Sequence, residues 1–244
     1  MGSRKLWGWM AFIVLVFVLA GEHKTETQKA EHQHSQNDKR ATQKTGYQQV
    51  YKAASQGNAL DESLLGEMYF SGIGVQQNYR KGFYWVHKAA VHGNAISEGM
   101  LGALYYVGQQ GVIQNYRKAF FWYKKSASQG NALAEVFLGE MYQKGLSVQQ
   151  NYRKGFYWVH KAATQGNARG EALTGILYYN GQGVPQNYVN AYMWFALAKA
   201  MEKPGSNSYQ MLSDGMRRAR ANMTPGQIAR AQSMAGAWER VHGK

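Results

Sequence analysis

The chain has 244 residues, of which 45% are hydrophobic, and it carries a formal net charge of +14 at pH 7. This hydrophobic content is ample for a buried core. Because the sequence has no cysteine, it cannot contain disulfides, a thiolate metal site or a cysteine-linked lipid anchor.

The N-terminal segment predicts export. Arg4 and Lys5 precede an unbroken apolar run from Leu6 to Ala20, and Val18 and Ala20 have the small side chains typical of a signal-peptidase site. The run of about 15 residues is shorter than the roughly 20 that span a bilayer. We therefore predict that residues 1–20 are a signal peptide, which places the chain in the periplasm or outside the cell. A retained inner-membrane anchor facing the periplasm is the alternative.

Residues 21–46 are almost entirely polar and predict a disordered linker, because such a stretch buries too little surface to offset its ordering entropy. His23, His32 and His34 lie within it. We interpret them as incidental residues of a soluble spacer rather than as metal ligands.

Two markers then recur in phase. Asn-Tyr-Arg-Lys begins at Asn78, Asn115 and Asn151 and weakens to Asn-Tyr-Val-Asn at Asn187, with steps of 37, 36 and 36 residues. The second marker, Gly-Asn-Ala, keeps the same period and begins at Gly57, Gly93, Gly130 and Gly166. A repeat of this length is typical of an elongated helical solenoid.

Each unit predicts two helices. In residues 95–131, Leu101 and Tyr105 form the inward stripe of a first helix, a glycine turn follows, and Asn115 caps a second helix. Gly130 is expected to end that helix in the left-handed conformation. A glycine recurs in the middle of every first helix, which predicts close helix crossing: Gly66, Gly102, Gly139 and Gly175. Ser147 replaces the second turn glycine of the third unit, so a different turn is expected there.

The combination Leu-Gly-x-x-Tyr, Gly-x-Gly-Val, Tyr-x-Lys-Ala-x-x-Trp and Lys-Ala-Ala resembles the Sel1-like repeat, a relative of the tetratricopeptide repeat, in its bacterial exported form. The resemblance covers residues 47–203, as a half unit and four full units. Residues 204–244 resemble the tail that closes such arrays, with Thr224, Pro225 and Gln227 as a helix start. The resemblance implies an all-α solenoid with C-terminal capping helices.

No catalytic constellation emerges from the sequence. His87 and His160 occupy equivalent positions without a nucleophile or carboxylate at useful spacing. The turns at Gly72 and Gly181 lack the strand and lysine of a phosphate loop. We expect no enzyme activity, no cofactor and no metal. Some secreted relatives are linked to cell-wall or β-lactam hydrolysis, but they are cysteine-rich, so a hydrolase ranks low.

The resemblance implies that the first helices line a concave docking face. Placing Leu65 and Tyr69 inward predicts that residues 63, 67 and 70 and their equivalents point outward. Exposed aromatic rings on such a row would anchor a partner; the alternative is that neighbouring units partly bury them. The predicted protein-binding residues are Phe70, Tyr106, Tyr179, Glu67, Glu140 and Gln143.

A basic edge is the other candidate surface. Arg80, Arg117 and Arg153, each followed by a lysine, fall in the first turn of successive second helices. Cations there oppose the helix dipole. The arginines either pair with first-helix glutamates (Glu62, Glu98, Glu135 or Glu171) or attract an anionic partner.

Together these patterns predict a non-enzymatic, monomeric scaffold that binds a protein or peptide in the bacterial envelope or on a host. Adhesion to an anionic envelope lipid or polymer through the basic edge is the alternative. Nucleic acid is a poor candidate, because export removes the chain from it.

Overall fold

The computed structural model describes residues 46–242. The predicted signal or anchor segment, and all of the predicted linker except Gly46, therefore lie outside the described residues. Residues 46–55 are helical, and the further helices are α2 (Ala59–Ser71), α3 (Tyr79–Val91), α4 (Ala95–Val107), α5 (Tyr116–Ser128), α6 (Ala132–Lys144), α7 (Tyr152–Thr164), α8 (Ala168–Asn180), α9 (Tyr188–Ala200), α10 (Asn207–Arg220) and α11 (Pro225–His242). Within the described part there is no strand and no helix long and apolar enough to cross a membrane.

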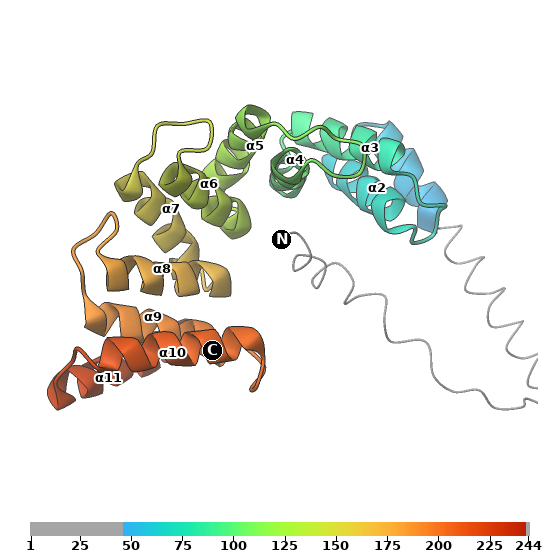
Figure 1. The fold of residues 1–244 in the computed structure, drawn as a ribbon. Coiled ribbons are helices and arrows are strands. Elements are labelled where there is room, and N and C mark those ends of the chain that lie inside the picture. Colours follow the sequence, from blue (N-terminus) through green and yellow to red (C-terminus); the bar gives the residue numbers. More distant parts are fainter. Residues whose placement is uncertain (1–45, 243–244) are drawn as a thin grey trace, which may run out of the picture. The chain divides into compact units, whose positions relative to one another are not determined.

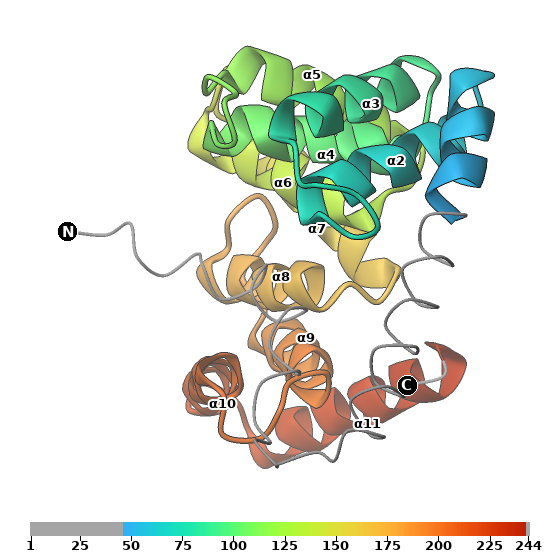
Figure 2. The same cartoon turned by 90° about the vertical axis from the view of Figure 1, so that its right-hand side faces the viewer.

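The described residues form an array in which each helix from α2 to α10 packs against its neighbours along the chain (Figure 1). The first helices of the four units are α2, α4, α6 and α8, and the second helices are α3, α5, α7 and α9. The C-terminal helices α10 and α11 both pack against α9 (Figure 2). The predicted all-α solenoid with capping helices is confirmed.

Asparagine begins both helices of every unit, as the two sequence markers predict. The side chain of Asn115 accepts a hydrogen bond from the backbone N–H of Lys118 at 3.0 Å, and Asn131 accepts one from Ala134 at 3.0 Å. The other units repeat this arrangement. Gly130 has a φ of +85°, as expected. Ser147 also keeps the left-handed conformation, with a φ of +61°, so the serine does not abolish this feature of the turn.

The mid-helix glycines mark close helix crossings, as predicted. A Cβ atom at Gly66 would lie 2.5 Å from Val86, and one at Gly139 would lie 2.6 Å from Val159. In the second and fourth units the obstacles are aromatic rings, those of Tyr123 and Phe195. Any side chain at these positions would force the two helices of the unit apart.

A buried glutamate joins the two helices in each of the first three units. Lys88 from α3 lies 2.9 Å from Glu62, and His92 contacts the other carboxylate oxygen at 2.7 Å. The second unit pairs Glu98 with Lys125 at 3.1 Å.

The third unit pairs Glu135 with Lys161 at 2.8 Å, and Gln165 donates to its other oxygen at 2.7 Å. In these units the carboxylate is held by the lysine near the end of the second helix. The suggested pairing of these glutamates with the arginines at the start of that helix is therefore wrong.

The capping helices close the C-terminal end. Thr224 and Gln227 bond reciprocally, each backbone N–H donating to the other side chain, and Pro225 is the first residue of α11, as predicted. Trp238 of α11 packs on Trp194 with ring centroids 5.1 Å apart. Met193 is buried beneath the same helix. Helix α11 thus covers on α9 a surface that remains exposed on the other second helices.

Candidate protein-binding surface

The predicted outward row of residues 63, 67 and 70 lies partly against neighbouring helices. Ser63 is buried and its hydroxyl accepts a hydrogen bond from Ser97 of the next first helix, at 2.8 Å. Phe70 is half-buried and packs against Tyr79 and over Gly82. Ser63 and Phe70 therefore lie where the chain packs on itself, rather than in open solvent.

Two other members of this row are also covered. Tyr106 is half-buried among aromatic rings, including Phe137 at a centroid distance of 5.8 Å. Glu140 was expected to point outward, but it is buried between Arg169 and Lys144, both of which form ion pairs with it. Glu140 is thus an internal link between α6 and α8 because the next unit supplies its arginine.

The remaining predicted residues have mixed surroundings. Glu67 is exposed, and partial burial raises the pKa of its carboxyl. Gln143 is half-buried over Gly155, where a Cβ atom would lie 2.5 Å from its side chain. Tyr179 packs on Tyr188 and lines a cleft described below. The expectation that Phe70, Tyr106 and Tyr179 are exposed anchors is corrected: all three rings are half-buried.

Apart from Ile176, which is the equivalent of residue 67, the exposed apolar side chains of the first helices lie outside the predicted row. Leu60, Ile96 and Leu133 occupy equivalent positions and are 70%, 56% and 53% exposed. Leu64 and Ile176 are exposed on the same side of their helices, opposite the buried stripe. We call these five residues the first-helix face.

Consecutive first helices contact one another, so this face extends along successive helices. Ser63 bonds Ser97, Phe137 packs on Tyr106, and Arg169 pairs with Glu140. The sequence signal for this face was an apolar residue two positions after the asparagine that caps the first helix in each of the first three units. The face was not predicted, because the outward row was assigned to residues 63, 67 and 70 and their equivalents.

The basic edge separates into two kinds of cation. Lys81, Lys118 and Lys154 lie over the rings of first-helix tyrosines, at 5.4, 5.0 and 5.5 Å from the ring centroids of Tyr69, Tyr105 and Tyr142. These lysines therefore pack against the first helix of their own unit.

The arginines of the edge have no such contact. Arg80, Arg117 and Arg153 are exposed, and none pairs with a carboxylate among the described residues. Tyr79 and Tyr152, immediately before two of them, are also exposed. The edge thus presents uncompensated positive charge beside aromatic rings.

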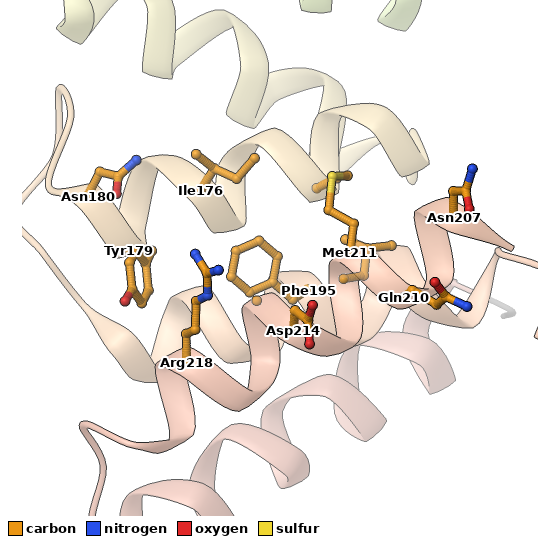
Figure 3. Close-up of a pocket in the computed structure, with 12 residues that line it drawn as sticks. Ile176, Tyr179, Asn180, Phe195, Asn207, Gln210, Met211, Asp214 and Arg218 are labelled. Carbon is orange, nitrogen blue, oxygen red and sulfur yellow. The ribbon is translucent and has the colours of Figure 1, made fainter. Parts of the chain in front are cut away.

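A cleft lies at the C-terminal end of the array, between α8, α9 and α10 (Figure 3). Its apolar part includes Ile176, Phe195 and Met211, and its polar part includes Asp214 and Arg218. The cleft continues the first-helix face, because Ile176 belongs to both.

The histidines singled out by the sequence pack on aromatic rings. His87 meets Trp122 edge to face, and His160 meets Trp194 in the same way, with centroid distances of 5.9 and 5.4 Å. Burial lowers the pKa of His160. Within residues 46–242 no group of histidine, aspartate and glutamate side chains is arranged to hold a metal ion.

The repeat geometry agrees with the similarity of this sequence to a known protein family. The Sel1 repeat model matches residues 62–94, 95–131, 132–167 and 168–202, so the chain belongs to the Sel1 repeat family. Proteins of this family are generally non-catalytic scaffolds that bind protein partners.

One solved structure gives the same picture of the fold. A Sel1 repeat protein from Oxalobacter formigenes is 26% identical, with a TM-score of 0.65 over 80% of this chain and 79% of that one. A protective antigen of uropathogenic Escherichia coli with an SLR fold is 23% identical over 81% and 56% of the two chains, with a TM-score of 0.42. Cysteine rich protein B of Helicobacter pylori is 22% identical over 56% and 95%, also with a TM-score of 0.42. No curated protein matches the sequence.

Proposed function

We propose that this protein is an exported, non-catalytic scaffold that binds a protein partner in the cell envelope or on a host through the first-helix face. The observation that carries the proposal is the repetition of exposed Leu60, Ile96 and Leu133 on consecutive first helices. Large apolar side chains in one repeated column form a patch of the kind that marks protein-binding sites. A partner segment with apolar side chains would cover them and gain about 1 kcal/mol or more at each position.

The test compares two triple variants of the full chain. Leu60→Ser, Ile96→Ser and Leu133→Ser together remove the apolar column of the first-helix face. The matched control changes three comparably exposed rings on the second helices: Tyr84→Ser, Phe121→Ser and Tyr157→Ser.

Both variants are compared with wild type by crosslinking in the native envelope, after circular dichroism has shown unchanged helical signal. We expect a specific partner to be lost with the first variant and retained with the control. Equal capture by all three proteins, or loss only with the control, contradicts the assigned face.

Export rests on Arg4, Lys5 and the apolar run that follows them. N-terminal sequencing of the protein from fractionated cells tests it. A chain that begins at Gly21 outside the cytoplasm supports cleavage, and an intact chain in the membrane fraction supports the anchor. An intact chain in the cytoplasm contradicts export.

A second candidate function is adhesion to an anionic envelope lipid or polymer through the basic edge. It is favoured by the exposed Arg80, Arg117 and Arg153, which have no carboxylate partner among the described residues. Binding to phosphatidylglycerol vesicles should fall steeply as salt is raised, because exposed charges are screened. Replacing the three arginines by glutamine should abolish it. Binding that is insensitive to both changes contradicts this candidate.

A further inference from the structure

The cleft between α8, α9 and α10 combines an apolar floor with one uncompensated cation. Its volume is about 480 Å³, which is within the range of small-ligand sites. Ile176, Phe195 and Met211 supply apolar surface from the three different helices. The Phe195 ring packs against Gly215, where a Cβ atom would lie 3.1 Å from it, so the glycine lets α10 approach the ring.

Arg218 supplies the positive charge. Its guanidinium lies beside Tyr179 and Phe195 at the cleft (Figure 3). Among the described residues it pairs with no carboxylate. The carboxylate on the same helix, Asp214, is already bonded by Arg217 at 2.8 Å. Arg218 is therefore available to an external anion, and Asp214 is largely compensated.

Side-chain amides complete the lining. Asn180, Asn207 and Gln210 lie around the cleft on α8 and α10 (Figure 3). An amide can both donate and accept, so it can bond the backbone of a peptide. The cleft thus offers partners for one carboxylate, one apolar side chain and a peptide group.

From this combination we propose that the cleft binds the C-terminal residue of a partner protein, with its terminal carboxylate on Arg218 and an apolar side chain against Ile176, Phe195 and Met211. A chain terminus carries these groups on a single residue, which suits a cavity of this size. The pairing of a guanidinium with a carboxylate is bidentate and charge-assisted, and would fix the orientation of the terminus. This proposal rests on the proposed protein-binding function and adds the chemistry of the partner's end.

The simplest probe is N-acetyl-L-leucine, which has the peptide group, apolar side chain and carboxylate of a C-terminal leucine. It is titrated into the ¹⁵N-labelled full chain, and Kd is read from the amide shifts of α10, including Gly215. A ligand of this size should bind in the millimolar range. N-acetyl-L-leucinamide, which lacks the carboxylate, and N-acetylglycine, which lacks the side chain, should each bind at least about tenfold more weakly.

Two arginine variants test whether Arg218 is the cation that binds the carboxylate of the probe. Arg218→Gln should raise Kd about tenfold. Arg220→Gln is the matched control, because it removes the same charge from the same exposed helix but does not line the cleft. Equal binding of N-acetyl-L-leucine and its amide, or equal losses in the two variants, would overturn the proposal.

A longer probe tests whether the ligand of the cleft is the end of a protein chain. The peptide acetyl-Gly-Ser-Gly-Ser-Leu with a free carboxylate should bind at least as tightly as N-acetyl-L-leucine, since a preceding chain must fit. Weaker binding of the peptide would overturn the assignment to a protein terminus. The variant with Leu60, Ile96 and Leu133 replaced by serine should bind both probes as wild type does, so failure of the first-helix face and failure of the cleft can be distinguished.

Discussion

Helices α3 and α7, apart from their last residues, lie in segments of identical sequence, Gln76 to Ala90 and Gln149 to Ala163, but they are followed by different units. The shared residues give the same cap, the same crossing valine and the same exposed tyrosine, which is 58% exposed in both copies. These features depend on the segment and its own first helix alone.

The differences come from residues outside the duplicated segment. The ring of His87 meets Trp122 and remains exposed, whereas His160 meets Trp194, which Trp238 of α11 holds in place. The lysine in each copy bonds a buried glutamate, but the second partner of that glutamate is His92 in one unit and Gln165 in the other. In a repeat array, local structure is thus inherited with the segment, and electrostatic surroundings are set by the neighbours.

The first prediction, which has the largest expected effect, concerns the close helix crossing that both copies share. Gly139→Ala should lower the free energy of unfolding by about 3 kcal/mol, because the new Cβ would lie 2.6 Å from Val159 and 2.8 Å from the carbonyl oxygen of Gly155. Gly66→Ala should cost somewhat less, since its nearest backbone atom is 3.0 Å away, in Val86.

Urea denaturation measures both glycine variants. Gly226→Ala, at the start of α11, is the control, because nothing lies within 4 Å of the added atom. A loss at Gly226 equal to that at Gly139 would show that close crossing is not the cause.

The second prediction concerns the ion pairs. Lys161→Met should lower the free energy of unfolding by about 2 kcal/mol at pH 7; this is less than a fully buried pair would lose, because the lysine side chain is 37% exposed. Burial raises the pKa of Glu135 and Lys161 opposes this rise, so the variant raises it further. A carboxyl with a raised folded pKa favours folding below its unfolded pKa and loses that contribution as pH rises. The destabilisation should therefore shrink between pH 7 and pH 5.

The first unit should respond differently. In Lys88→Met the carboxylate of Glu62 keeps the imidazole of His92 at 2.7 Å, whereas the carboxylate of Glu135 in Lys161→Met keeps the side-chain amide of Gln165. We expect Lys88→Met to be milder than Lys161→Met, by denaturation under matched conditions. Adding His92→Gln should remove the difference, because the first unit then has the glutamine of the third. A difference that survives this change contradicts the role of His92.

The regular parts of this fold could be predicted from the sequence because they depend on local geometry. The capping asparagines, the left-handed Gly130 and the reciprocal bonds of Thr224 and Gln227 are each defined within a few residues. A glycine column in mid-helix likewise has few explanations other than close crossing. Repetition strengthened each pattern.

The binding surface was harder to predict because it depends on packing between units. Successive residues of a helix are 100° apart, so residues 60, 63, 64, 67 and 70 all lie at least 100° from both Leu65 and Tyr69, and helix geometry alone does not separate the exposed positions from the covered ones. Whether such a position is covered depends on the neighbouring unit. Glu140 is buried because Arg169 reaches it from α8. The cleft beside Arg218 requires the position of α10, which no repeat pattern specifies.

The last prediction, which has the smallest expected effect, concerns the different surroundings of His87 and His160. Trp238→Ala should loosen Trp194 and let water reach His160, so the pKa of His160 should rise part of the way toward the ordinary value of about 6.5. Because a depressed histidine pKa gives stability that is lost as pH falls through the folded pKa, the variant should lose less stability than wild type over that window. NMR titration of the imidazole resonances measures the shift, at a temperature where the helical signal is intact. His87 is the internal reference, since its neighbour is Trp122, and an equal change in both would mean that the variant alters the whole array.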